Sequence, residues 1–296
     1  MAQDISIVIG AQNAKSTIAQ CLGSLLEQMQ SIDGEIVVAD SSTDGTDKIV
    51  AEQFPHVTLI RTTPDKLIPH LWGIGMQRAQ APIVGLTTAH CIPASDWVRT
   101  ILDEAKKHQD VAGFGGAIAP PENLPAKDWA VYFSRYSNFM PPAKPGPVND
   151  VPGDNAAYRK DALDICWADR EQGFWETLVH RALRQSGRTI YMCPAVSVKM
   201  GHTDSARDYF RIRFQHGRHY GSTRPDTGAL SRILRVIAAP ILMPYLVLRI
   251  GKRVAQQRPD FLPRYVAALP WLIYFMSGWS LGEIDGYLRP QSHAAI

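Results

Sequence analysis

The stretch that most constrains the fold is residues 35–46, EIVVADSSTDGT. Its uncharged apolar run, residues 36–39, is typical of a strand that is buried on both faces of a parallel sheet. Asp40 follows where this strand should end, and Asp44 in the small polar turn is expected to cap the next helix. A carboxylate at the carboxyl end of a central strand lies where open α/β sheets bind ligands. For this stretch alone, an ordinary turn without a ligand is the alternative.

Strands and helices alternate through the first 118 residues. Apolar residues recur at helical spacing in residues 18–29 and 71–79, and Ser95 is expected to cap a further helix. This alternation predicts an α/β fold with a mostly parallel sheet that is covered on both faces. The strands expected in addition to residues 36–39 are residues 5–9, 57–61, 83–87 and 111–118.

The composition changes between residues 120 and 152, where eight prolines predict a loop-rich excursion. A loop at residues 153–159 and a helix-compatible segment follow. Glu176 then opens a helix that Gly187 is expected to end, and residues 189–192 are expected to form a strand. In the first turn of a helix, the helix dipole favours an anion such as this carboxylate.

Positive charge is concentrated near the end of the chain, although the formal net charge is only +3. Residues 207–264 contain twelve basic and three acidic side chains, which favours an anionic partner such as a phosphate ligand or a membrane surface. A solvated basic face is the alternative. No recognition motif accompanies the arginines, so we expect no nucleic-acid partner.

Two uncharged runs, residues 236–248 and 265–282, interrupt this basic region. A spanning helix needs about 20 apolar residues, so we expect a hairpin in the cytoplasmic membrane interface, peripheral or re-entrant, with the arginines near lipid headgroups. A soluble helical subdomain is the alternative. The N-terminus shows no signal peptide, and the four cysteines show no CxxC spacing, both of which favour a cytoplasmic catalytic part.

Six segments taken in chain order resemble the family 2 glycosyltransferases. They are ISIVIGAQNAKSTIAQCLGSLLEQ, EIVVADSSTDGT, LTTAHCIP, GDNAAYRKDAL, GFWETLVHRALRQSGRTIYMCPAVSVKMGH and QHGRHYG. The resemblance implies a GT-A fold, a Rossmann-like sheet with helices on both faces. It implies a transferase domain at residues 1–225, with a nucleotide-binding half at 1–118 and an acceptor-binding half at 119–225. The apolar helical region, residues 226–296, would then lie at the membrane interface.

The resemblance also implies roles for individual residues. Asp40 has a chemical reason to hold the base of a UDP-like donor, because a carboxylate accepts the imide N–H of uracil. Glu176 occupies the position of the acidic residue that activates the acceptor hydroxyl in an inverting transfer. A helix-capping carboxylate without a chemical role is the alternative for Glu176. The positions expected to bind the donor are Gln12, Asn13, Asp40, Ser42, Thr88 and His90.

One departure concerns the metal. Where the family commonly has Asp-x-Asp, this chain has Thr88-Ala89-His90, without a carboxylate. His90, with His202, is one candidate set of ligands for a divalent cation, and imidazole suits manganese better than magnesium. Alternatively, Arg213 and Arg218 replace the metal, or the protein is inactive. A simple hydrogen-bonding role is the further alternative for His90.

The remaining implied positions concern the diphosphate or the acceptor. They are Asn155, Gln215 and Arg218, and His219 stands where processive members of the family have Trp, which favours a single transfer. We therefore expect an inverting transferase that uses a nucleotide-diphosphate sugar, first of all a UDP-sugar. The expected acceptor is a hydroxyl group, with a lipid-linked molecule or a cell-surface glycan precursor as the classes considered.

Two other functions compete with a glycosyltransferase as explanations of this sequence. A non-catalytic GT-A-like nucleotide-binding or scaffold protein is the alternative suggested by the lost carboxylates. A dinucleotide-dependent oxidoreductase is excluded, because GAQNAK is not the Gly-rich turn that such enzymes need after the first strand.

Overall fold

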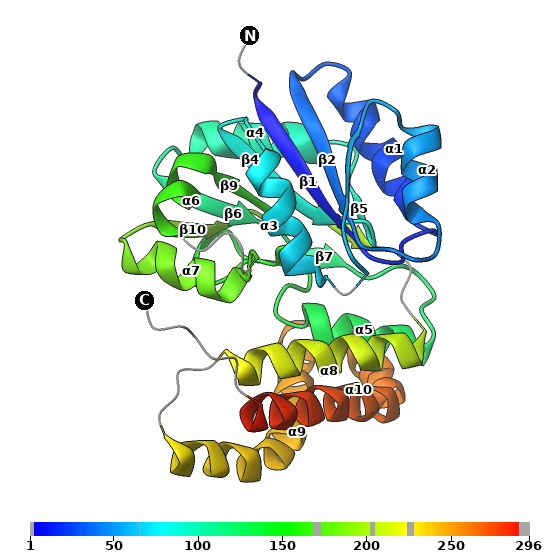
Figure 1. The fold of residues 1–296 in the computed structure, drawn as a ribbon, viewed down its shortest axis with the longest axis vertical. Helices are drawn as coiled ribbons and strands as arrows, with labels where there is room; N and C mark the ends of the chain where they lie inside the picture. The colour runs from blue at the N-terminus through cyan, green and yellow to red at the C-terminus, as the bar shows by residue number, and fades with distance from the viewer. Residues whose placement is uncertain (1–2, 65, 168–172, 202–204, 224–227, 290–296) are drawn as a thin grey trace. The chain divides into compact units, whose positions relative to one another are not determined.

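The chain forms two compact units in a computed structural model that describes residues 3–64, 66–167, 173–201, 205–223 and 228–289 (Figure 1). The first unit comprises residues 1–121 and 139–202, and we call it the sheet unit. The second comprises residues 122–138 and 203–296, and we call it the helical unit. The predicted boundary at residue 225 differs from this division, because residues 122–138 and 205–223 pack with the C-terminal helices.

The sheet unit is built around eight strands (Figure 1). They are β1 (Ile5–Ala11), β2 (Gly34–Asp40), β3 (Thr58–Arg61), β4 (Ile83–Thr88), β6 (Val111–Gly115), β8 (Gly146–Val148), β9 (Asn155–Arg159) and β10 (Thr189–Met192). Their order is β3-β2-β1-β4-β9-β6-β10-β8, and β1 pairs in parallel with both β2 and β4. β9 is antiparallel to β4 and β6. The predicted α/β class with a mostly parallel sheet is confirmed.

Helices cover both faces of this sheet (Figure 1). Because side chains alternate along a strand, Ile7 and Ile9 of β1 face one hydrophobic core and Val8 faces the other. The first core is completed by α1 (Ile18–Met29), α2 (Thr46–Gln53) and α4 (Trp97–Lys107). The second is completed by α3 (Ile68–Arg78), α6 (Lys160–Cys166) and α7 (Glu176–Gln185). A separate three-stranded sheet consists of β5 (Cys91–Pro93), β11 (Val198–Met200) and β7 (Ile118–Ala119).

Four local predictions differ from the structure. Residues 155–159 form β9 rather than a loop, since partners on both sides supply their hydrogen bonds. The strand predicted at 111–118 ends at Gly115, because Gly116 lies against the backbone of Val196. Ser95 makes no cap, as α4 begins after Asp96 without a side-chain cap. The proline-rich excursion contains a helix, α5 (Ala126–Tyr136).

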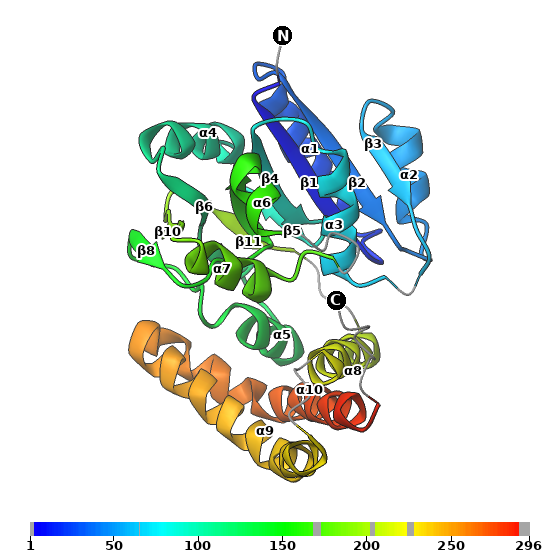
Figure 2. The same cartoon turned by 60° about the vertical axis from the view of Figure 1, so that its left-hand side comes forward.

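The helical unit is organised around α10 (Leu262–Leu288). This helix packs against α5, α8 (Ala206–Ser222) and α9 (Ala229–Gln257), and Figure 2 shows it between α8 and α9. A short turn of 3-10 helix, Pro259–Phe261, joins α9 to α10.

Glycines allow the backbones of α8 and α10 to touch. A Cβ atom added to Gly282 of α10 would lie 2.0 Å from the carbonyl oxygen of Phe214. One added to Gly217 of α8 would lie 2.2 Å from the carbonyl oxygen of Trp279. Small residues four apart permit such close helix crossings, as in small-xxx-small contacts of membrane proteins. Glycine at these positions therefore fixes how α8 and α10 pack.

The helix α9 has a solvent-exposed apolar face. Among the described helices, residues 230–257 are the single segment long and apolar enough to cross a membrane by length and composition. This helix is longer than the uncharged run at 236–248 suggested, because its arginines are part of it. Large exposed side chains recur along one face of the helix at helical spacing, namely Leu230, Leu234, Ile237, Ile241 and Leu248. Such a patch marks an interaction surface.

A buried polar network anchors α7 to the sheet. The ring of His180 is fully buried, and its two nitrogens lie 2.7 Å from the hydroxyl of Tyr158 and 3.1 Å from a carboxylate oxygen of Asp150. The hydrogen bond from His180 lowers the pKa of Asp150. Since Glu176 begins the same helix, this network helps to fix the position of Glu176.

Gly282→Ala should destabilise the helical unit by about 1–3 kcal/mol, because the new methyl group meets backbone that has no room to move. Gly23→Ala in α1 is the control, since nothing lies within 4 Å of its added Cβ. It should leave stability unchanged or raise it by about 0.5–1 kcal/mol through helix propensity. Thermal unfolding of both variants measures the difference, and equal effects would contradict the close contact.

Asp150→Asn should reduce stability near neutral pH and have little effect in acid. A carboxyl whose pKa is lowered on folding stabilises the protein fully above its unfolded pKa of about 3.9. That contribution is lost as the pH falls through the lower pKa of the folded state. Urea unfolding at a series of pH values should show the parent and the variant converging in acid. Tyr158→Phe, which leaves a buried ring nitrogen unpaired, should instead cost about 1–3 kcal/mol across that acid range.

Candidate functional site

Three parallel strands end at one edge of the sheet and bring the predicted donor-binding residues together. The strand register places Asp40, at the end of β2, beside Ala11 at the end of β1. It places Thr88, at the end of β4, beside Gly10. β9 runs in the opposite direction, so its first residue, Asn155, pairs with Thr87 at the same edge.

Asp40 is fully buried and only partly hydrogen-bonded. Its Oδ1 accepts a hydrogen bond of 2.5 Å from the hydroxyl of Ser42, which itself accepts from the backbone N–H of Asn13. Its Oδ2 has no hydrogen-bond partner, and Nε of Arg61 lies 3.5 Å away. Burial raises the pKa of Asp40, and the hydrogen bonds from Ser42 oppose this. Oδ2 is thus an acceptor available to a ligand.

The turn after β2 is held by the other residues of the first loop. Asn13 adopts a left-handed conformation with φ of 51°, and its side-chain oxygen accepts a hydrogen bond of 3.0 Å from the amide of Thr43. The predicted cap at Asp44 is not formed, because Gly45 is the N-cap residue of α2; the carboxylate of Asp44 instead accepts a hydrogen bond from the amide of Thr46 within the turn. These bonds hold the Asp40 turn beside the β1 loop.

His90 points one ring nitrogen at the backbone and leaves the other free. Its Nε2 lies 2.9 Å from the main-chain oxygen of Gln12, whose own side chain donates to the carbonyl of Lys66. A carbonyl oxygen only accepts, so Nε2 carries the proton. Nδ1 is buried and has no hydrogen-bond partner. A ring held in this way by a backbone carbonyl is typical of histidines that ligate metals through the other nitrogen.

Glu176 is connected to the end of β4 through the turn before β9. Its Oε1 accepts a hydrogen bond of 3.1 Å from the amide of Gly153. The next residue, Asp154, accepts a hydrogen bond of 2.8 Å from the hydroxyl of Thr88. Glu176 is partly exposed at the first turn of α7, whereas Asp154 is almost fully buried. The predicted base, Glu176, is therefore linked to the last residue of β4 through hydrogen bonds to the neighbouring residues Gly153 and Asp154.

Two residues of this edge were not predicted as site residues. Asp154 places a carboxylate beside Thr88, where the sequence showed none in the expected Asp-x-Asp position. Trp72 donates a hydrogen bond of 2.7 Å from its indole to the carbonyl of Thr87 and packs where a side chain on Gly153 would otherwise lie. Both contacts depend on tertiary structure, so the sequence could not reveal them. The one sequence feature that could have drawn attention to Asp154 is its place in the segment Gly153-Asp154-Asn155.

The remaining predicted residues lie in other surroundings. The amide of Asn155 is fully buried and makes three bonds within the protein, to the indole of Trp97 and to the carbonyls of Ala117 and Val196. These bonds are structural, so contact with a ligand stays a prediction for Asn155. Gln215 and Arg218 belong to α8 of the helical unit. His202 lies outside the described residues.

The fit of this edge to a metal ion is partial. Within the described part of the chain, no three His, Cys, Asp or Glu side chains come together to hold a metal. The free Nδ1 of His90 nevertheless suits one ligand. Cations that act on phosphates commonly use one or two protein ligands and complete their shell with phosphate oxygens. The residues present therefore fit a cation shared with a diphosphate better than a closed protein cage.

Comparisons with known proteins agree with this fold. A mannosyltransferase from Pyrobaculum calidifontis in complex with GDP-Man and Mn²⁺ matches at 18% identity and a TM-score of 0.51, over 96% of this chain and 87% of that chain. TarS from S. aureus in complex with UDP-GlcNAc matches at 12% identity and a TM-score of 0.50, over 95% and 90%. GalNAc-T7 with UDP, GalNAc and Mn²⁺ matches at 14% identity and a TM-score of 0.52, over 78% and 53%.

Similarity to solved structures at such low sequence identity shows only the fold. The family is instead shown by the match of the sequence to a family model. No curated protein matches the chain significantly. The family described as "Glycosyl transferase family 2" matches residues 6–166, which contain both the Asp40 turn and the Thr88–His90 segment. The chain therefore belongs to glycosyl transferase family 2 and is a glycosyltransferase with a GT-A fold.

Proposed function

We propose that this protein is an inverting glycosyltransferase that moves a sugar from a nucleotide-diphosphate sugar, first of all a UDP-sugar, to a hydroxyl acceptor. The observation that carries the proposal is the shared edge at the ends of β1, β2 and β4, where the free oxygen of Asp40, the ring of His90 and the series from Thr88 to Glu176 meet. Solved relatives with this fold hold GDP-Man or UDP-GlcNAc.

Asp40 is proposed to bind the nucleotide base. The buried Oδ2 lacks a hydrogen bond, and a uracil imide N–H would supply the missing donor. Gln12, Asn13 and Ser42 form the surrounding loop and hold this carboxylate in place. A donor nucleotide would thus supply the hydrogen bond that this oxygen lacks.

Glu176 is proposed as the general base. Its carboxylate would take the proton of the acceptor hydroxyl, whose oxygen forms a bond to the anomeric carbon while the bond to the diphosphate breaks on the opposite face. Oε1 of this carboxylate accepts the hydrogen bond from the amide of Gly153, which orients Glu176 at the first turn of α7. The Asp150–His180–Tyr158 network keeps α7 in position for this step.

For a divalent cation, His90 is the proposed protein ligand through Nδ1, and the donor phosphates would supply oxygens. When bound, the cation neutralises charge on the departing diphosphate, and manganese suits an imidazole ligand better than magnesium does. Two solved relatives contain Mn²⁺. His202 stays the second proposed ligand. The alternative is that Arg213 and Arg218 neutralise the diphosphate, although Arg218 already pairs with Asp285 at 3.0 Å.

The proposed acceptor is a lipid-linked molecule or a cell-surface glycan precursor, and the proposed location is the cytoplasmic membrane surface. The exposed apolar face of α9 supports attachment to a membrane. The acceptor class rests on this attachment alone, because no described residue identifies the acceptor's chemistry.

Asp40→Asn should weaken UDP binding roughly 10- to 100-fold, the loss expected for one hydrogen bond to a charged acceptor. Isothermal calorimetry with UDP measures the change. Asp33→Asn is the matched control, because the exposed Asp33 precedes β2, at the end of that strand opposite to Asp40. Equal losses in the two variants would contradict a base contact at Asp40.

Glu176→Gln should abolish sugar transfer, with a loss of roughly 100-fold or more, while leaving UDP affinity unchanged. Release of UDP from a panel of UDP-sugars, with a membrane lipid extract as the acceptor source, measures the activity. Manganese, magnesium and EDTA are compared in parallel. Turnover that survives EDTA would favour the arginines over His90. The absence of both turnover and UDP binding in the parent protein would instead favour a non-catalytic GT-A-like protein.

A further inference from the structure

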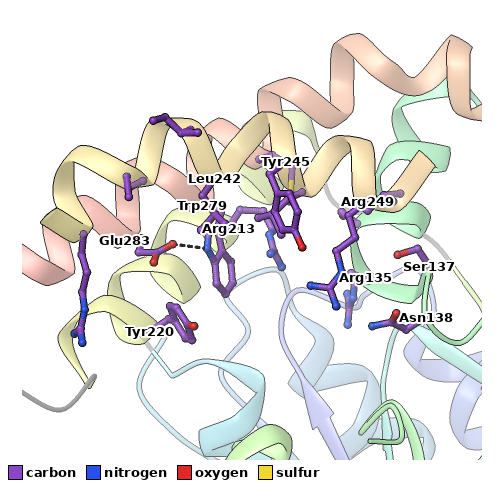
Figure 3. A pocket seen from close by; sticks show the side chains of 18 of the residues that line it. Arg135, Ser137, Asn138, Arg213, Tyr220, Leu242, Tyr245, Arg249, Trp279 and Glu283 are labelled. Atoms are coloured by element: carbon purple, nitrogen blue, oxygen red, sulfur yellow. Dashed lines mark hydrogen bonds between the residues drawn. The ribbon is translucent and has the colours of Figure 1, made fainter. Parts of the chain in front are cut away.

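The helical unit contains a cavity of its own, and none of its lining residues belongs to the sheet unit. Its volume is about 770 Å³, and side chains from α5, α8, α9 and α10 line it (Figure 3). We call it the arginine pocket, after five of its lining residues. These are Arg135, Arg213, Arg235, Arg249 and Arg253.

Basic side chains outnumber acidic ones in the lining of the arginine pocket. Glu283 is the one acidic side chain among the lining residues that the structure describes. Its carboxylate accepts hydrogen bonds from the indole of Trp279 at 3.0 Å and from the hydroxyl of Tyr287 at 2.5 Å, and Figure 3 shows the first of these. Five guanidinium groups around one carboxylate form a site for an anion.

Arg213 shows the effect of this crowding. Its guanidinium lies 4.5 Å from the ring centre of Trp279, and its buried Nε has no hydrogen-bond partner. Burial lowers the pKa of Arg213, and the nearby charge of Arg135 adds to this effect, while Tyr209 opposes it. A buried donor of this kind is rare in native proteins unless a ligand or water satisfies it.

The other part of the lining is apolar and leads to the surface of α9. Leu242, Leu246 and Met276 line the pocket, together with Ile241 and Tyr245. Ile241 and Tyr245 are also 70% and 56% exposed, so the pocket opens directly onto the apolar face of α9. A ligand that matches both parts carries an anionic group at one end and a hydrocarbon chain at the other.

We propose that the arginine pocket binds the phosphate headgroup of a membrane lipid, whose chains lie along the exposed face of α9. Guanidinium groups suit phosphate because they donate paired hydrogen bonds to its oxygens. A soluble phosphate would explain the arginines but would leave the adjoining apolar face of α9 unaccounted for. The proposal goes beyond the glycosyltransferase function and does not depend on it, since every residue used belongs to the helical unit.

The test measures binding of the full-length protein to vesicles of phosphatidylcholine, with and without phosphatidic acid. Arg213→Gln/Arg253→Gln removes two charges from the pocket. Arg207→Gln/Arg211→Gln is the matched control, because it removes two charges from exposed positions of α8 outside the pocket. If only general electrostatic attraction acts, each lost arginine weakens vesicle binding similarly, by about fivefold, whether it lies in the pocket or outside it. The proposal instead expects the pocket variant to bind at least ~10-fold more weakly than the control.

Three further results decide the outcome. Equal losses in the two variants, or binding that does not require phosphatidic acid, would overturn the proposal. Inorganic phosphate or glycerol 3-phosphate that binds as tightly as the vesicles would also overturn it, in favour of a soluble ligand. Thermal unfolding checks that the variants are folded, and vesicle binding as the readout, rather than UDP binding or sugar transfer, separates this test from the transferase proposal. If the double variant does not fold, Arg249→Gln replaces it, since Arg249 is exposed at the pocket and its loss leaves the packing intact.

Discussion

The antiparallel pairing of β9 with β4 is the contact on which the site at the sheet edge depends. The strands β1, β2 and β4, which carry the loops proposed to bind the donor, run in the opposite direction to β9, so β9 begins at the edge where they end. That beginning brings Gly153 and Asp154 beside Thr88. Because Gly153 has no side chain, Trp72 and Glu176 can both approach the turn. One strand reversal thus joins the proposed base to the donor-binding loops.

Hydrogen-bond satisfaction distinguishes Asn155 from the polar residues that we propose to bind ligands. Asn155 is as buried as Asp40, but its amide is fully engaged with Trp97 and two carbonyl groups. Asp40 Oδ2, His90 Nδ1 and Arg213 Nε are buried atoms without a hydrogen-bond partner. Buried groups that lack a hydrogen bond are destabilising and therefore rare, which is the reason for proposing a ligand at each of these three atoms. The first two lie in the sheet unit and the third in the arginine pocket.

The helical unit combines a tightly packed helix pair with an exposed apolar helix. α8 and α10 meet through glycines at backbone contact, which makes a compact pair without large side chains between them. α9 keeps its large apolar residues on the outside and directs several arginines toward the pocket. An amphipathic helix with this distribution is suited to a membrane surface, where the apolar face and the charged face meet different surroundings.

The sequence alone determined the α/β class, the alternation of strands and helices in the first 118 residues, and the position of Asp40 at the end of its strand. Local patterns decide these features, because apolar periodicity and turn residues act over a few positions. The sequence did not reveal that residues 155–159 form a strand, that Asp154 lies beside Thr88, or that α5 and α8 belong with the C-terminal helices. These features depend on partners distant in the chain. Only the tertiary structure could decide them, since a polar segment becomes a strand or a site through the neighbours it meets.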